Sequence, residues 1–206
     1  MQAQVFGEIR KQAKLLRAAE RFRATAPGTL SAILMDMAVE TLIPVEEYLH
    51  TSYSPDREYR DGVLMERNVG DNAHSLLQIA LGSYARRRRK AWGVQVYTEF
   101  RIRAREGWYP IPDVCIYALP APIERYPSRM PLLWVEILSE DDRMIEVWDK
   151  AKDLVACGAP NVWIIHPQTL DSQLLTPAGG PNEVPDKTLR IPDTSIVIPL
   201  LEVMEE

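Results

Sequence analysis

Two apolar segments separated by an amphipathic one constrain the fold of this 206-residue chain most strongly. Residues 132–138 and 162–165 are almost wholly apolar, as is typical of short strands buried inside a sheet. Between them, residues 141–157 carry apolar side chains at helical spacing, and Gly158 is well suited to follow the end of a helix. Because a strand–helix–strand unit forms a right-handed crossover, we predict that the two strands are parallel.

Other motifs indicate further strands around this unit. Asp61-Gly62 lies between two short extended segments, which is a strong hairpin signal. Residues 94–103 alternate between apolar and polar side chains and predict one half-buried strand. Residues 73–90 carry apolar side chains at helical spacing, with Leu76, Leu77, Leu81 and Tyr84 among those expected to face inward, and Gly93 is expected to close that helix. The elements together predict an α/β domain with a mixed central sheet, flanking helices and extra β-hairpins.

The charge of the chain is unevenly distributed. A formal net charge of −5 excludes a protein that grips nucleic acid through bulk positive charge. Residues 1–34 carry six cations and two anions, however, so the rest of the chain has a net charge of −9. Residues 5–24 predict an amphipathic helix, and we divide the chain into an N-terminal helical extension, 1–36, and a domain, 37–206. A simple appendage, a docking helix and a transit peptide are three interpretations of the extension, of which we favour the first.

Cysteine content and hydropathy indicate the compartment. Cys115 and Cys157 are too few for a disulfide framework, and both lie in apolar stretches, as expected in a reducing environment. No apolar run approaches the ~20 residues of a membrane helix. The N-terminus lacks the apolar core of a secretory signal. We therefore expect a cytoplasmic protein that does not associate with membranes.

Two carboxylates interrupt segments that are otherwise apolar. Glu136 lies inside the strand predicted at 132–138, and Asp113 follows Pro112 at the edge of a second strand, 111–117. A buried carboxylate is costly unless it is paired, protonated or bound to a metal. Each residue alone is explained by a satisfied ion pair. Together they can converge on a hard cation such as Mg²⁺, which activates water and neutralises a phosphate.

A lysine is a natural third member of such a site, because its ammonium can position water and stabilise charge that develops on a phosphate. The helix predicted at 141–157 offers Lys150 and Lys152. At ~100° per residue they flank the apolar face on opposite sides, so helical geometry does not choose between them. Lys150 is equally well placed to pair with Glu146 on the exposed surface of the helix.

Clustered cations, rather than net charge, decide where a phosphate backbone is contacted. A basic run ends the helix predicted at 73–90, and two further arginines follow in the next segment. The run is explained equally well as a solvated helix end, where cations complement the helix dipole. The DNA-contact candidates are Arg86, Arg87, Arg88, Arg89, Lys90, Arg101 and Arg103.

Several short motifs occur in order from about Thr41 to Pro177. They are Glu58-Tyr59 before Asp61-Gly62, His74-Ser75, Pro112-Asp113-Val114, Glu136-Ile-Leu-Ser139, Lys150 before Gly158, and Val162-Trp-Ile-Ile165. This ordered set resembles the Uma2 family (DUF820), a group of restriction-endonuclease-like proteins in the PD-(D/E)XK nuclease superfamily. The resemblance implies a restriction-endonuclease-like core and a DNA hydrolase that depends on Mg²⁺, with Mn²⁺ as an alternative metal.

The resemblance also implies roles for individual residues. Asp113 and Glu136 match the two acidic metal ligands of the family pattern. The usual nuclease lysine stands two residues after the second acid, where this chain has Leu138. The family instead points to Lys150 on the following helix, and it favours Lys150 over Lys152.

Two more residues match positions near the family's site, Glu58 and His74, although His74 is also explained as a cap or packing residue at a helix start. The chain departs from the family pattern at three positions, none of them a predicted ligand. Val63 stands where an acid is frequent, Leu154 where Tyr is common, and His166 where Asp is usual.

We therefore expect a metal-dependent DNA endonuclease. A catalytically inactive nuclease-like module that binds DNA or protein is the alternative, and a structural or toxin-neutralising partner role is a third hypothesis. Because many nucleases of this fold use one subunit for each strand of DNA, the resemblance also implies a homodimer. The sequence has no motif that reads base edges, so it makes no prediction of cleavage specificity.

Overall fold

The computed structural model describes residues 42–68 and 70–205. The N-terminal helix predicted from the sequence, and with it the division into 1–36 and 37–206, falls outside the described residues and stays a prediction. In chain order the described elements are α3 (Val45–His50), β1 (Arg57–Arg60), β2 (Val63–Glu66), α4 (Asn72–Trp92), β3 (Val94–Thr98), β4 (Trp108–Tyr109), β5 (Val114–Ala118), β6 (Leu133–Ile137), α5 (Met144–Ala156), β7 (Val162–Ile165), β8 (Ser172–Thr176), β9 (Gly179–Glu183), β10 (Thr188–Arg190), β11 (Val197–Pro199) and α6 (Leu200–Glu205).

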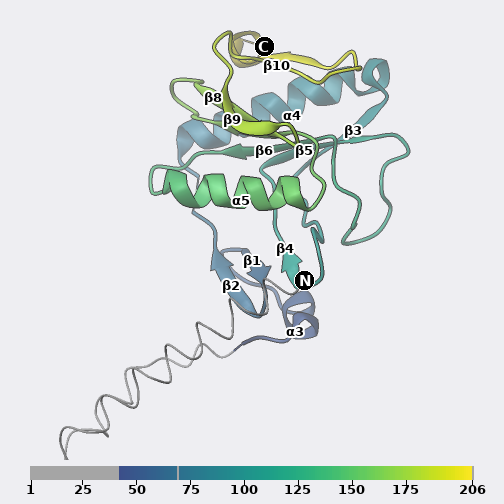
Figure 1. Cartoon of the computed structure of the whole chain (residues 1–206), viewed down its shortest axis with the longest axis vertical. Coiled ribbons are helices and arrows are strands. Elements are labelled where there is room, and N and C mark those ends of the chain that lie inside the picture. The colour runs from purple at the N-terminus through teal and green to yellow at the C-terminus, as the bar shows by residue number, and fades with distance from the viewer. Residues whose placement is uncertain (1–41, 69, 206) are drawn as a thin grey trace, which may run out of the picture. The chain divides into compact units, whose positions relative to one another are not determined.

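A six-stranded mixed sheet forms the centre of the domain, in the order β3-β5-β6-β7-β8-β9 (Figure 1). β6 and β7 are parallel, with Trp134 opposite Val162, whereas the other neighbouring strands are antiparallel. The parallel pair joined through α5 confirms the crossover predicted from the two apolar segments. The mixed sheet with flanking helices confirms the predicted fold class.

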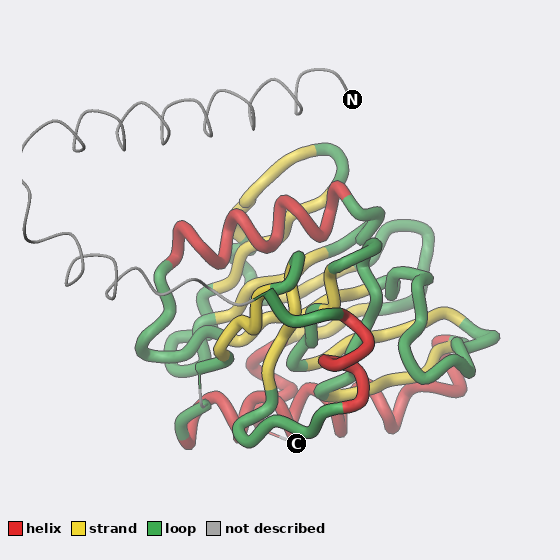
Figure 2. Tube along the Cα trace, turned by 90° about the horizontal axis from the view of Figure 1, so that it is seen from below, coloured by secondary structure: helices red, strands yellow, loops and turns green. Residues whose placement is uncertain are grey.

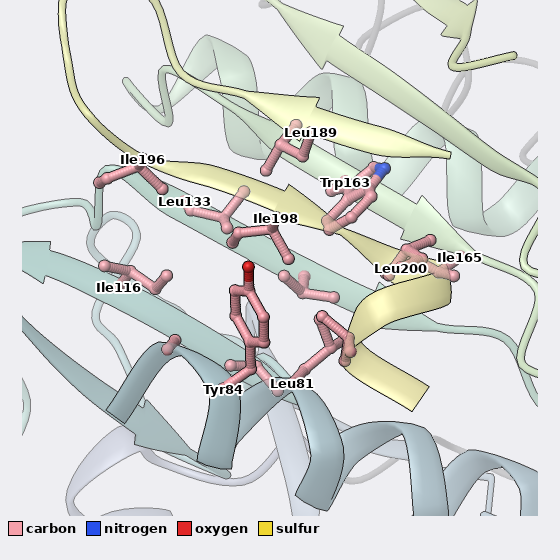
Figure 3. Packing of buried hydrophobic residues seen from close by; sticks show 14 of the residues in the cluster. Leu81, Tyr84, Ile116, Leu133, Trp163, Ile165, Leu189, Ile196, Ile198 and Leu200 are labelled. Atoms are coloured by element: carbon pink, nitrogen blue, oxygen red, sulfur yellow. The ribbon is translucent and has the colours of Figure 1, made fainter. Parts of the chain in front are cut away.

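α4 and α5 cover opposite faces of the sheet, as Figure 1 and the turned view in Figure 2 show. Alternation along β6 sends Leu133, Val135 and Ile137 into the core beneath α4. Figure 3 shows Leu81 and Tyr84 of α4 pointing toward this core, which the β10–β11 hairpin and α6 also enclose. The other face of β6 carries Trp134 and Glu136 toward α5.

A second, three-stranded sheet has the order β2-β1-β4 and packs with α3. Its hairpin turns at Asp61-Gly62, whose φ angles of 51° and 92° are positive, so the hairpin predicted from this dipeptide is confirmed. Tyr48, Tyr59 and Tyr109 form its buried aromatic cluster, with the Tyr48 and Tyr59 ring centroids 4.8 Å apart. This small sheet holds β1, and therefore Glu58, beside the main sheet.

Four predictions of local structure need correction. The strand expected over 111–117 is β5, which begins only at Val114 and ends at Ala118. The strand expected over 94–103 ends at Thr98, because the next residue, Glu99, has a positive φ of 52° and leaves the extended conformation. The helix expected over 141–157 is α5 and begins only at Met144, after a turn in which the Asp142 carboxylate accepts from Ser139 N. Leu76, expected to face inward, is 50% exposed.

The described residues contain no helix with the length and apolar character needed to cross a membrane.

Candidate active site

A cavity of about 490 Å³ lies beside the β1–β2 hairpin, the end of β6 and α5. Its lining is strongly acidic, with eight Asp or Glu residues against three Lys or Arg residues. None of the seven cations predicted to contact DNA lines it. The structure brings together in its wall all five residues that the sequence marks as catalytic candidates, namely Glu58, His74, Asp113, Glu136 and Lys150.

Strand register places the two predicted metal ligands side by side. Val114 of β5 pairs with Val135 of β6, so Asp113, the residue before β5, lies next to Glu136 at the end of this ladder, where Asp113 N donates to Val135 O at 3.1 Å. Both side chains line the cavity. Ile137 N donates to Asp113 Oδ2 at 2.7 Å, which fixes the Asp113 carboxylate. Two acids on neighbouring strands therefore face the same cavity.

A histidine and an arginine flank Asp113. His74 Nε2 lies 3.4 Å from Asp113 Oδ2, and its interaction with the Asp113 carboxylate raises the pKa of His74 above its ordinary value, in spite of burial. Asp71 caps α4 by accepting from His74 N at 2.8 Å, so the cap and the contact with Asp113 together orient this histidine. Arg67 Nη2 lies 3.3 Å from Asp113 Oδ1 and the same guanidinium also pairs with Glu99.

Lys150 joins two carboxylates from different sheets. Its Nζ lies 2.8 Å from Glu136 Oε1 and 2.8 Å from Glu58 Oε1. Glu58 Oε1 also accepts from Ile111 N at 3.0 Å, which anchors β1 to the segment that precedes β5. Lys152 is instead an exposed partner of Asp149. The docking of α5 therefore places Lys150, and not Lys152, against these two carboxylates, a placement that helical geometry alone left open.

Trp134 is a further contact of the site that sequence reasoning missed. Its indole Nε1 donates to Glu136 Oε1 at 2.6 Å. The two side chains are two residues apart on β6 and so lie on one face of the strand. The two-residue spacing is the sequence signal that could have indicated this contact. It is a weak signal, because an apolar strand contains other pairs of residues with the same spacing. Arg67 gave no signal, since a lone arginine after a hairpin is ordinary.

Burial and charge shift the ionisation of the two central groups. Burial raises the pKa of Glu136 to about 7; Lys150 opposes this rise, whereas the nearby Asp113 and Glu58 carboxylates add to it. Burial by itself lowers the pKa of Lys150, but Glu136 and Glu58 outweigh burial and raise it above its ordinary value. The lysine is therefore a cation at neutral pH, surrounded by more carboxylate charge than it offsets.

The donor set fits a magnesium ion held partly by water. Within residues 42–68 and 70–205, no group of three or more His, Cys, Asp or Glu side chains is arranged to hold a metal. Mg²⁺ commonly uses one or two carboxylates together with waters and substrate phosphate oxygens. Asp113 and Glu136 supply two such carboxylates, and in the described part of the chain Glu136 Oε2 accepts no hydrogen bond.

The predicted DNA-contact residues lie away from the cavity. His74 stands at the start of α4, and the run Arg86–Lys90 begins 12 residues later, about 18 Å along the helix axis. Arg101 pairs with Asp56 at 2.6 Å, and its guanidinium lies over the ring of Tyr48. The side chain of Arg101 is only 18% exposed. Arg103 is exposed. The site and the basic run are thus separate features of the domain.

Comparison with known proteins agrees with this architecture. A putative nuclease of DUF820 from Anabaena variabilis ATCC 29413, known from a crystal structure, is similar in fold with a TM-score of 0.68. The two are 19% identical, and the similarity covers 79% of this chain and 98% of the other. No curated protein matches. A family model described as "Putative restriction endonuclease" matches residues 45–203 and supports a nuclease. The chain therefore belongs to the Uma2 family.

Proposed function

We propose that this protein is a metal-dependent endonuclease that hydrolyses phosphodiester bonds in DNA. The observation that carries the proposal is the placement of Asp113, directly before β5, next to Glu136 of β6 in the wall of one cavity, with Lys150 Nζ 2.8 Å from Glu136. Membership of the Uma2 family supports the same reaction class. The cytoplasmic location and the homodimer expected from the sequence stay predictions.

Asp113 and Glu136 are the residues that would hold Mg²⁺ or Mn²⁺. Such an ion, when bound, lowers the pKa of a coordinated water and neutralises phosphate charge. The acidic rim supports a role for a cation: Asp141, Asp142 and Asp149 line the cavity, and their carboxylates repel a nucleic-acid backbone. We therefore expect DNA to enter the cavity productively only when a divalent cation is present.

Lys150 acts as a hydrogen-bond donor rather than as a base. Its raised pKa keeps the ammonium protonated at neutral pH, and two of its three N–H bonds are directed at Glu58 and Glu136. The third is available for the attacking water or for a non-bridging phosphate oxygen. Glu58 holds the ammonium in this position, and His74 with Arg67 holds Asp113.

In the reaction, the oxygen of a water molecule forms a bond to phosphorus while the bond from phosphorus to one sugar oxygen breaks. The water loses its proton to solvent and the departing sugar oxygen gains one, so the products are a phosphate monoester and an alcohol. Lys150 stabilises the negative charge that builds up on the phosphate oxygens in this process.

A cleavage assay on the full chain tests the proposal. Plasmid and linear DNA are incubated with Mg²⁺ or Mn²⁺ and with EDTA, next to single-stranded RNA as a second substrate. We expect DNA cleavage that EDTA abolishes and that Asp113→Asn reduces about 100-fold or more. Asn retains an oxygen that can accept from Ile137 N, which limits damage to the fold. Asp141→Asn, on the rim, is the matched control and is expected to retain activity.

Cleavage that is equal in wild type and Asp113→Asn would refute the proposal, as would cleavage that persists in EDTA. Binding of DNA without any metal-dependent turnover would support the alternative of an inactive nuclease-like module. Preferential cleavage of RNA would retain the site and its chemistry but would overturn the assignment of DNA as the substrate.

A further inference from the structure

We propose that Trp134 is a positioning residue that orients the Glu136 carboxylate so that Oε1 faces the protein and Oε2 faces the cavity. The inference rests on the proposed role of Glu136 as a metal ligand and extends it to a residue that contacts neither metal nor substrate.

The geometry of the indole is restrictive. Trp134 is fully buried on the α5 side of the sheet, among the side chains of a core cluster that includes Ala151 and Leu154. Dense packing of this kind holds a large aromatic ring in one orientation. The indole N–H is a donor without any acceptor function, and it points to Glu136 Oε1 at 2.6 Å. A rigid donor is therefore aimed at one oxygen of a carboxylate that the protein needs to orient.

The two oxygens of Glu136 consequently differ. Oε1 accepts from Trp134 Nε1 and lies 2.8 Å from Lys150 Nζ. Oε2 accepts no hydrogen bond from the described part of the chain. Two donors that approach one oxygen from separate elements, β6 and α5, oppose rotation of the carboxylate plane. The orientation that a metal requires is thus set before the metal binds, as is typical of partners that hold metal ligands from behind.

A second tryptophan shows that the contact is specific to Trp134 and not a general property of buried indoles here. Trp163 of β7 lies opposite Val135 and is also fully buried, but its side chain enters the core beneath α4 (Figure 3). Its Nε1 has no hydrogen-bond partner among the described residues. Replacing Trp163 by Phe therefore removes an indole N–H that orients nothing, which makes it a matched control.

Metal binding without DNA tests the inference. Trp134→Phe and Trp163→Phe each shorten a buried aromatic side chain and delete one N–H. Titration calorimetry with Mn²⁺ and with Mg²⁺ is carried out on both variants and on wild type. We expect Trp134→Phe to bind about tenfold more weakly and Trp163→Phe to stay within about twofold of wild type. In cleavage, Trp134→Phe is expected to need more metal for half-maximal rate and to recover most of its rate at saturating metal.

A measurement on the unmodified protein guards against a variant that fails to fold. The indole ¹⁵N–H resonance of each of the five tryptophans is assigned and followed as Mg²⁺ is added. We expect the Trp134 resonance to shift more than that of Trp163. The inference would be overturned if the two folded variants bound metal with equal affinity. It would also be overturned if calorimetry showed metal binding and the Trp134 resonance did not shift. A wild type that binds no metal and cleaves nothing would instead contradict the proposed function.

Discussion

Lys150 and Glu136 meet at 2.8 Å although one residue lies on α5 and the other on β6. The crossover that makes β6 and β7 parallel also lays α5 across the face of β6 that carries Glu136. A long side chain from the helix can therefore reach the strand carboxylate. In the proposed site, the lysine that nuclease patterns place on the strand itself would be Lys150 of the covering helix.

Replacing this lysine separates its role from that of its neighbour. We expect Lys150→Met to lower the cleavage rate about 100-fold or more, because the ammonium that stabilises phosphate charge is removed. It should also destabilise the fold by about 3 kcal/mol, since Glu58 and Glu136 are left without their shared partner. Cleavage kinetics and urea unfolding measure both effects. Lys152→Met, which removes only an exposed partner of Asp149, is the control, and equal effects of both variants would contradict the assignment.

The raised pKa of Glu136 predicts a pH dependence of stability. Between the ordinary value of 4.5 and the folded value of about 7, the folded state keeps a proton that the unfolded state has released. Stability from this group is therefore present at pH 4 and falls as pH rises to 7. Urea unfolding at pH 4 to 8 measures the unfolding free energy of wild type and of Glu136→Gln, whose side chain cannot titrate. We expect the unfolding free energy of wild type to fall relative to that of the variant as pH rises. A constant difference between the two proteins would be the contrary outcome. Added Mg²⁺ should restore stability more at pH 8 than at pH 5.

The contacts of Glu58 link the small sheet to the site and predict that this residue matters for stability. Glu58→Gln keeps an oxygen for Ile111 N but removes the charge that faces Lys150. We expect a loss of about 1–3 kcal/mol in unfolding free energy and slower cleavage with the metal requirement largely unchanged. Glu66→Gln, on the same hairpin, alters a surface pair with Arg57 and should cost no more than about 0.5 kcal/mol. Similar effects of the two changes would argue against the link.

The basic run on α4 predicts a salt dependence of DNA binding. If Arg86, Arg89 and Lys90 bind phosphates, the triple Ala variant should bind DNA more weakly, and its log–log salt slope should fall by about 0.9 for each phosphate that is no longer neutralised. Fluorescence anisotropy with labelled duplex at several salt concentrations measures the slope. Arg190→Ala, which removes an exposed cation paired with Asp186, is the control. An unchanged slope would leave the run as a solvated helix end.

Local patterns were enough to predict the parts of the fold whose causes are local. The apolar strands β6 and β7, the helix between them and the Asp61-Gly62 turn follow from side chains close together in sequence. The extent of β3 does not, because the alternation of side chains continues to residue 103 although the backbone leaves the extended conformation at Glu99, whose φ is 52°. Leu76 shows the same limit, since helical spacing defines an apolar face but not the area of that face which a neighbour covers.

For the site, the sequence by itself determined which residues were anomalous, because a carboxylate such as Glu136 within an apolar strand is costly wherever the strand lies. Only the tertiary structure decided how these residues are used. It set Asp113 next to Glu136 at the end of the β5–β6 ladder, placed Lys150 rather than Lys152 against Glu136 through the docking of α5, and aimed Trp134 at one oxygen. Each of these depends on distances between elements far apart in the chain, and such distances are fixed by packing rather than by local side-chain pattern.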